Sequence, residues 1–174
     1  MEQGSNCEKI LKGIGVSSGI VHQPAFVLEK KDFEVSYYSI EPQKVKSELQ
    51  RFRNAIEATR RQILLIQNEI TQKLGAYEAN IFDAHLLLLE DKSIYNATLS
   101  CFQEHHCNID YCFATVIRRF VKQFSSIEDS HLKERCIDLK DVAKRVLQNL
   151  MGHSVDRLND LFSEPRILIS NVNE

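Results

Sequence analysis

The sequence predicts an α+β protein that is mostly α: an antiparallel bundle of helical hairpins inserted into a partial, small α/β domain. Two long segments repeat apolar residues at the spacing of a helix face. Short β-branched stretches without that period stand before and after these segments. We therefore expect residues 1–32 and 153–174 to belong to the small domain and residues 33–152 to form the bundle.

Composition bounds the class of protein. The 174 residues are 43% apolar and 26% charged, an ordinary balance for a soluble globular chain. A net charge of -2, with acids and bases interspersed, gives no reason to expect a nucleic acid or a membrane as partner. No apolar run approaches the roughly 20 residues that span a bilayer, and the N-terminus lacks a signal-peptide layout. Five cysteines without a framework suit a reducing compartment, so we expect a cytoplasmic protein.

Residues 10–29 are β-branched and glycine-rich, which predicts strands. The stretch GIGVSSG, residues 13–19, has two interpretations. As a phosphate loop it lacks the Lys-Ser/Thr ending of a P-loop and the glycine spacing of a dinucleotide site. We favour a turn or bulge between two strands, where glycine permits unusual backbone angles.

Residues 43–74 are predicted to form one long helix, because apolar residues recur there four and three apart without an interrupting Gly or Pro. Pro42 suits its first turn and Gly75 its end. The buried stripe is expected to contain Val45, Leu49, Phe52, Ile56, Thr59, Ile63, Ile66 and Ile70.

The rest of the bundle follows from weaker signals. One or two helices are expected over about residues 77–104, and another over about 110–124. A second long helix is predicted from Leu132 to Leu150, started by Asp129 or Ser130 and closed by Gly152. The apolar run 166–170 predicts a final strand.

A group of metal-ligand types lies between two of these helices, namely Cys101, His105, His106, Cys107 and Cys112. Their spacing matches no standard zinc pattern. Cys101 and Cys112 also fall at apolar helix positions, where a free cysteine behaves as a small hydrophobic residue. We favour burial and expect no metal.

The stretch ANIFDAHLLLLED, residues 79–91, raises the question of His85. On a helix, His85 shares a face with Ile81, Phe82 and Leu89, and no partner for a catalytic triad or a metal stands near it. A structural role is the simplest interpretation. However, four consecutive leucines cannot all face one core, and exposed leucines rimmed by charges are typical of a docking patch.

The charged segment ERCIDLKDVAKR, residues 134–145, has two interpretations as well. It can be a solvated helix face, on which Glu134 and Asp138 would repel each other. It can also be a partner surface, since Arg135 near a helix start is unfavourable for the helix dipole. Composition leaves both open.

Three stretches, KGIGVSSGI, ANIFDAHLLLLED and HLKERCIDLKDVAKRVLQNLMG, occur in an order and spacing that resemble the N-terminal region of the Enzyme I family. These are the phosphoenolpyruvate–protein phosphotransferases (transferases, or kinases) of the bacterial sugar transport phosphotransferase system. The resemblance covers about residues 10–172. It implies a small α/β subdomain of the swivelling phosphohistidine type and an inserted helical subdomain that binds the phosphocarrier protein HPr.

The resemblance also implies what this chain lacks. The full-length enzyme passes a phosphoryl group from phosphoenolpyruvate to its own histidine and then to HPr. None of the six histidines here has the family's Gly-Gly-x-Thr-Ser-His context, so we expect that residue beyond Glu174 and no catalytic residue in this chain. Mg²⁺ and phosphoenolpyruvate are expected to bind the C-terminal part of the full-length homodimer. This chain alone is expected to be inactive, metal-free and monomeric.

The resemblance assigns a partner-binding surface. It implies that HPr docks on His85, Leu87, Leu88, Asp91, Phe124, Leu132 and Arg135. Lys92 and Ser93 stand where acids are common in the family, so the electrostatic part of this surface is weaker or tuned to another carrier. Two alternatives are an Enzyme I paralogue that serves a regulatory, nitrogen-type carrier, and a helical interaction module without a phosphotransfer role.

Overall fold

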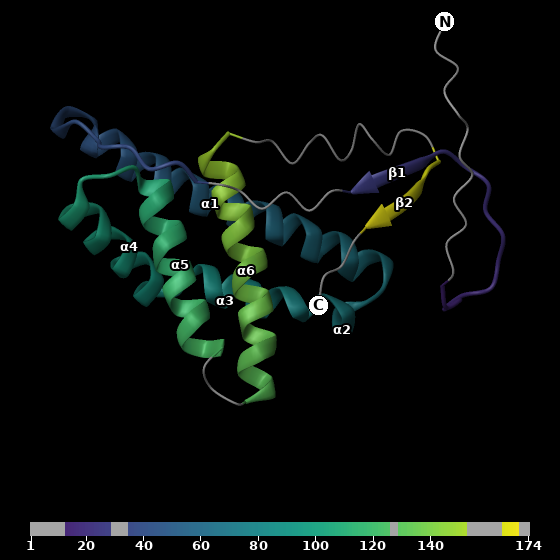
Figure 1. Ribbon diagram of the computed structural model, residues 1–174. Coiled ribbons are helices and arrows are strands. Elements are labelled where there is room, and N and C mark those ends of the chain that lie inside the picture. The colour runs from purple at the N-terminus through teal and green to yellow at the C-terminus, as the bar shows by residue number, and fades with distance from the viewer. Residues whose placement is uncertain (1–12, 29–34, 126–128, 153–164, 171–174) are drawn as a thin grey trace, which may run out of the picture. The chain divides into compact units, whose positions relative to one another are not determined.

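The computed structural model describes residues 13–28, 35–125, 129–152 and 165–170. The chain divides into two compact units, one of residues 1–30 with 159–174 and one of residues 31–158. Both boundaries fall outside the described residues, so the predicted domain limits stay predictions. The first unit contributes two strands and the second contributes the helices (Figure 1). The predicted fold class, mostly α with a small α/β part, is confirmed.

The longest helix of the second unit is α1 (Val45–Lys73), preceded by the short 3-10 helix η1 (Pro42–Lys44). Proline opens the first turn as predicted, because its missing N–H costs nothing there. The helix ends before Gly75, whose φ of 114° favours glycine and whose N–H donates back to the Thr71 carbonyl (3.2 Å).

The segment predicted as one or two helices forms three: α2 (Ala76–Ala79), α3 (Ile81–Leu89) and α4 (Lys92–His105). The break before α4 has a clear cause. Asp91 is the N-cap, and its Oδ1 accepts hydrogen bonds from the Ser93 backbone N–H (2.7 Å) and hydroxyl (2.7 Å). The prediction of one or two helices did not locate this break, because no cap was recognised at Asp91.

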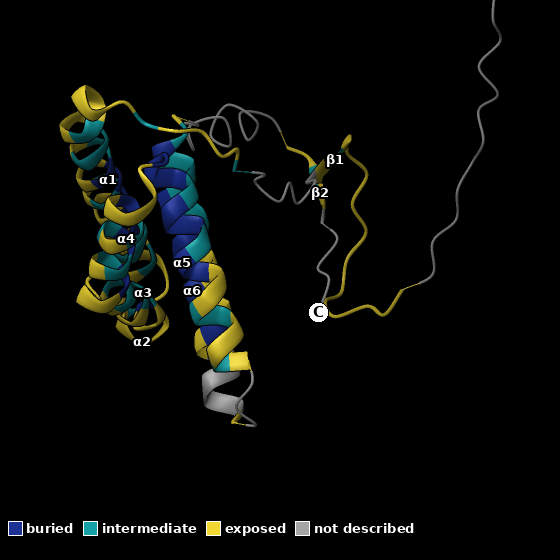
Figure 2. Cartoon of the chain, turned by 60° about the vertical axis from the view of Figure 1, so that its left-hand side comes forward, coloured by how far each residue is buried: buried dark blue, intermediate teal, exposed yellow. Residues whose placement is uncertain are grey.

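The bundle is completed by α5 (Ile109–Ser125) and α6 (Ser130–Leu150). Both agree with the predicted helices, and α6 ends before Gly152, with a φ of 69°. Figure 2 shows a buried stripe along α5, whereas α2 is largely exposed. In the part of the chain that the structure describes, no helix is long and apolar enough to cross a membrane.

The core forms where the predicted stripes of the long helices meet. On α1, Phe52, Thr59 and Ile63 are buried and the rest of the predicted stripe is half-buried. On α6, apolar residues that recur three and four apart along the predicted helix are buried, namely Cys136, Leu139, Ala143, Val146 and Leu150.

Two polar clusters fasten the bundle at one end. Arg51 donates to Asp110 and to Glu48 (3.0 Å), and Glu48 also accepts from the Ile109 N–H (3.2 Å) at the start of α5. Asn108 accepts from the Tyr38 N–H (3.1 Å) and donates to the Ser36 carbonyl (3.0 Å). These bonds hold the segment that leads into η1 against the turn between α4 and α5.

The first unit contains β1 (Ala25–Leu28) and β2 (Ile167–Ser170), which pair in parallel with Ala25 opposite Ile167. The C-terminal strand was predicted correctly, but the N-terminal prediction was too long. Residues 13–24 form no strand, and Ile14, Val16 and Ile20 are almost fully exposed. No strand follows GIGVSSG before Ala25, because β-propensity alone does not form a strand. Residues 10–12 lie outside the described residues, so the turn between two strands stays a prediction.

Candidate docking surface

The candidate surface lies where α3 packs on α6. The His85 Nε2 atom is 3.4 Å from the Asp138 Oδ1 atom, with 16% and 25% of these side chains exposed. The two atoms are within ion-pair distance but are not aligned as a hydrogen bond, so Nε2 is buried without a hydrogen-bond partner. The Phe82 ring meets the His85 ring edge to face at 5.8 Å. His85 is thus neither a core residue nor freely exposed; it lies at the edge of the helix contact.

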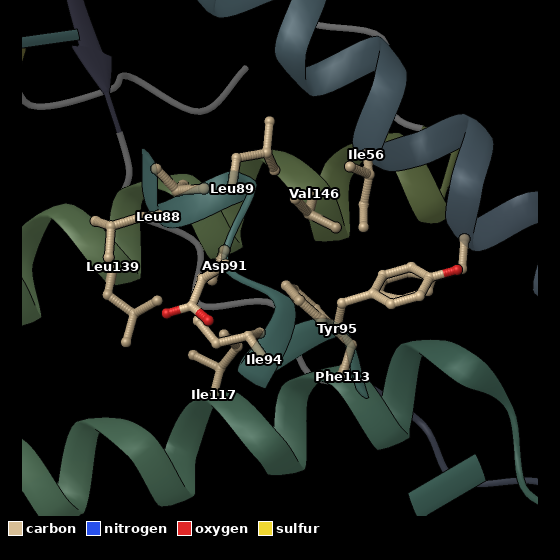
Figure 3. Close-up of a pocket in the computed structure, with 13 residues that line it drawn as sticks. Ile56, Leu88, Leu89, Asp91, Ile94, Tyr95, Phe113, Ile117, Leu139 and Val146 are labelled. Carbon is tan, nitrogen blue, oxygen red and sulfur yellow. The ribbon is translucent and has the colours of Figure 1, made fainter. Parts of the chain in front are cut away.

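Leu88 lies deeper than the sequence suggested and is half-buried, whereas Asp91 lines the same pocket but is exposed. Figure 3 shows them in an apolar pocket with Ile94, Ile117 and Leu139. The remaining cavity is about 20 Å³, room for one water molecule, so this is a packed contact and not a ligand site. Its lining comes from α1 and from α3 to α6: Phe52, Ile56, Leu88, Leu89, Asp91, Ile94, Tyr95, Phe113, Ile117, Leu139, Val142, Ala143 and Val146.

Among the members of the predicted set whose side chains the structure describes, Leu87, Asp91 and Arg135 are exposed. Leu87 is 71% exposed, as expected for at least one of the four leucines. Arg135 is exposed on α6. One turn later on the same helix, Asp138 lies beside His85, and Leu139 lines the pocket around Leu88. Ile81, which the helix pattern placed on the buried face, is 57% exposed because α3 is covered on one side only.

The remaining two residues lie at the ends of α5 and α6. Phe124 is half-buried in the last turns of α5, where its ring meets Phe120 edge to face at 6.1 Å. Leu132 is in the first turn of α6, and its side chain lies outside the described residues. The structure therefore brings His85, Leu88, Asp91 and Arg135 to one helix junction, and leaves Phe124 at the end of α5.

Several charges around this junction are already paired. The Glu90 carboxylate accepts from Arg60 (3.2 Å), and the Asp83 carboxylate accepts from the Gln67 amide (2.7 Å). Asp91 accepts both of its hydrogen bonds from Ser93. Asp91 therefore serves as a helix cap within the pocket wall, a role that sequence reasoning did not separate from docking.

Sequence reasoning also missed Asp138 as a partner of His85. The only signal in the sequence is its place one turn after Arg135. The charge pattern there indicates only repulsion between Asp138 and Glu134. The distance along the chain between His85 and Asp138 hides the contact. Only the packing of α3 on α6 brings the two together.

The cysteines near the α4–α5 turn form a buried thiol cluster. The Cys107 and Cys112 sulfurs are 3.2 Å apart, and both side chains are fully buried. Burial was expected for Cys112 and Cys101, and Cys101 is half-buried. Burial raises the pKa of the Cys112 thiol, and hydrogen bonds with Cys107 and Cys101 add to this effect. His105 and His106 are exposed instead. Among the described residues, no three His, Cys, Asp or Glu side chains are placed to hold a metal ion.

Known proteins are similar to this chain in sequence and in fold. Residues 12–135 match the family described as PEP-utilising enzyme, N-terminal. The phosphoenolpyruvate-protein phosphotransferase of Listeria monocytogenes is 35% identical over 84% of this chain and 25% of its own length. That of Staphylococcus epidermidis is 34% identical over 94% of this chain and 28% of its own length. The chain thus spans about a quarter of the length of these curated relatives.

Solved structures agree with the fold. A solution structure titled Enzyme I (nEIt) superposes with a TM-score of 0.71 and 32% identity, over 87% of this chain and 60% of that chain. The N-terminal domain of an Enzyme 1 of the nitrogen type superposes with a TM-score of 0.62. At 21% identity, over 84% of this chain and 58% of that chain, it supports the fold alone.

Proposed function

Because this chain belongs to the PEP-utilising enzyme family, of which it carries the N-terminal domain, we propose that it is the docking part of a phosphoenolpyruvate–protein phosphotransferase. Its helical unit binds HPr, and the full-length enzyme passes a phosphoryl group from phosphoenolpyruvate through an enzyme histidine to that carrier. The observation that carries the proposal is the α3–α6 junction, where His85 lies 3.4 Å from Asp138. Leu87 is exposed on α3, and Arg135 is exposed on α6 one turn before Asp138.

The chemistry of this junction supports docking rather than catalysis. Leu87 offers a large apolar side chain to solvent, and Arg135 offers a cation one turn from the carboxylate of Asp138. Apolar anchors beside charges give a protein interface its affinity and its orientation. His85 is half enclosed by Phe82 and Asp138, so it contributes to the shape and hydrogen bonding of the surface and does not accept the phosphoryl group.

The transfer itself is assigned to other parts of the full-length enzyme. Among the described residues, no group of His, Cys, Asp or Glu is placed to hold a metal ion. We propose that Mg²⁺ binds the C-terminal part of the full-length enzyme. In the proposed division of labour, the helical unit lowers the translational freedom of the carrier and holds its reactive group near the enzyme histidine. We propose a cytoplasmic location and a monomeric state for this chain, and dimerisation of the full-length enzyme through its C-terminal part.

The test is an NMR titration of the 174-residue chain with ¹⁵N-labelled HPr from a bacterium such as Listeria monocytogenes. We expect chemical shift changes around the active-site histidine of the carrier, strongly reduced by Arg135→Glu. The matched control is Arg119→Glu, which makes the same charge change at an exposed position of α5. It should bind as the unmodified chain does.

Either of two results would contradict the proposal. The first is the absence of shifts with the unmodified, folded chain. The second is an equal loss for both arginine variants, which would indicate a nonspecific charge effect. If instead a nitrogen-type carrier binds and HPr does not, the chain serves a regulatory paralogue, the alternative that the sequence left open.

A further inference from the structure

The geometry of the α3–α6 junction points to a positioning residue that the docking surface needs. We propose that Asp138 fixes the neutral tautomer of His85 in which Nε2 carries the proton, so that Nδ1 faces the partner as a hydrogen-bond acceptor. This inference rests on the proposed docking function and adds a statement about the partner: at His85 it supplies a hydrogen-bond donor.

The first step is the state of Nε2. This atom is buried and has no hydrogen-bond partner. A buried polar atom without a partner is rare in a folded protein, because it loses its water and gains nothing in return. The Asp138 Oδ1 atom lies 3.4 Å from His85 Nε2, within ion-pair distance. The carboxylate accepts and cannot donate, so the proton belongs on Nε2.

The second step is that no other carboxylate that the structure describes at this junction competes for this role. On α3 and the turn after it, Asp83 accepts from Gln67, Glu90 from Arg60, and Asp91 from Ser93. On α6, Asp141 is exposed and Arg135 cannot accept a hydrogen bond. Within the described residues, Asp138 is therefore the acceptor that faces the His85 ring.

The third step concerns the partner. In a neutral imidazole one nitrogen donates and the other accepts, and a bond to the first fixes the second. With Nε2–H held by Asp138, Nδ1 is left as the acceptor of a ring that is 16% exposed at the edge of the α3–α6 contact. It recognises a hydroxyl, an amide N–H or a cationic group, next to apolar surface. A partner that offers a carboxylate at this point would be rejected, because two acceptors would face each other.

The experiment has two readings on the same samples. The first is the tautomer of His85, from the imidazole ¹⁵N shifts of the free 174-residue chain at a pH of about 8, where an ordinary histidine is neutral. The second is the affinity for HPr by titration. The variants are Asp138→Ala, which removes the acceptor, and Asp138→Asn, which keeps an acceptor oxygen. Asp141→Ala is the matched control, since it removes an exposed carboxylate one turn away.

We expect Nε2–H in the unmodified chain, in Asp138→Asn and in Asp141→Ala, and a mixture of tautomers in Asp138→Ala. HPr affinity should fall about tenfold in Asp138→Ala alone. A purely structural role for Asp138 would not move the tautomer. Asp138 is on the surface side of α6, and Asp138→Asn keeps its shape, so a folded variant is available.

The possible failures are distinguishable. An Nδ1–H tautomer in the unmodified chain, or one unaffected by Asp138→Ala, overturns the inference. The expected tautomer with unchanged HPr affinity in Asp138→Ala overturns its docking part. The expected tautomer in a chain that does not bind HPr at all means that the proposed function has failed, and with it the use of His85 in docking, while the Asp138–His85 bond stands.

Discussion

Two pieces of the helical unit pack on α1 and differ sharply in burial. The hairpin of α4 and α5 places Phe102, Ile109 and Phe113 at 4% exposure or less. The segment of α2 and α3 leaves Tyr77 85% and Leu87 71% exposed. Both pieces are helical and rich in apolar residues, yet only the second leaves large apolar side chains exposed to solvent.

The difference indicates a division of roles between stability and recognition. Burial of large apolar side chains is the main favourable term in folding, so the hairpin of α4 and α5 contributes more to the stability of the bundle than the segment of α2 and α3 does. Apolar side chains that stay in water contribute little to folding and remain available to a partner. The comparison therefore predicts that substitutions in the two pieces have opposite signatures.

The largest effect is expected at Phe102 on α4, which is 2% exposed. Phe102→Ala should lower the free energy of unfolding by about 3–5 kcal/mol, because a cavity replaces a buried ring. Urea unfolding of the full chain, followed by circular dichroism, measures it. Leu87→Ala is the counterpart from the open segment and should change stability by less than about 0.5 kcal/mol. Equal losses for the two variants would break the comparison.

The same Leu87→Ala variant also tests the comparison through its effect on binding. It should weaken HPr binding about tenfold, since an exposed apolar anchor is lost from the surface. Calorimetric titration at fixed salt measures the affinity. Leu65→Ala, at a site 68% exposed on α1, is the control and should leave it unchanged. A tenfold loss for Leu65→Ala would mean that the surface has been placed on the wrong helices.

The smallest expected effect is the pH dependence of stability that arises from the buried Cys112 in the hairpin of α4 and α5. The pKa of Cys112 is raised above its ordinary value of 9.0, first by burial. The folded state thus keeps the thiol neutral. Its contribution to stability is complete below pH 9 and is lost as the pH rises above it, where only the unfolded chain releases the proton. Stability should therefore decline above pH 9. Cys112→Ala should show a shallower decline in urea midpoints between pH 8 and 10.

The long helices and their buried stripes could be predicted because apolar spacing, Pro42 and Gly75 are local signals. The break between α3 and α4 could not be predicted, since it depends on how Asp91 caps α4. The burial of Leu88 could not be predicted either, since it depends on how α6 packs over Leu88. Asp138 was missed for the same reason: its partner is far away in sequence. β1 is short because its length is set by pairing with β2, which is far away in the sequence. No local sequence pattern contains this information.

That parallel pairing has a consequence for the order of folding. β1 ends at Leu28 and β2 begins at Ile167, so the whole helical unit separates two strands that must meet. Closing a long unfolded loop is entropically costly, whereas helical hairpins form from contacts close in sequence and form fast. Folding of the helices first shortens the effective loop. We infer that the strands pair last, and that a substitution such as Phe102→Ala also delays sheet formation in refolding experiments.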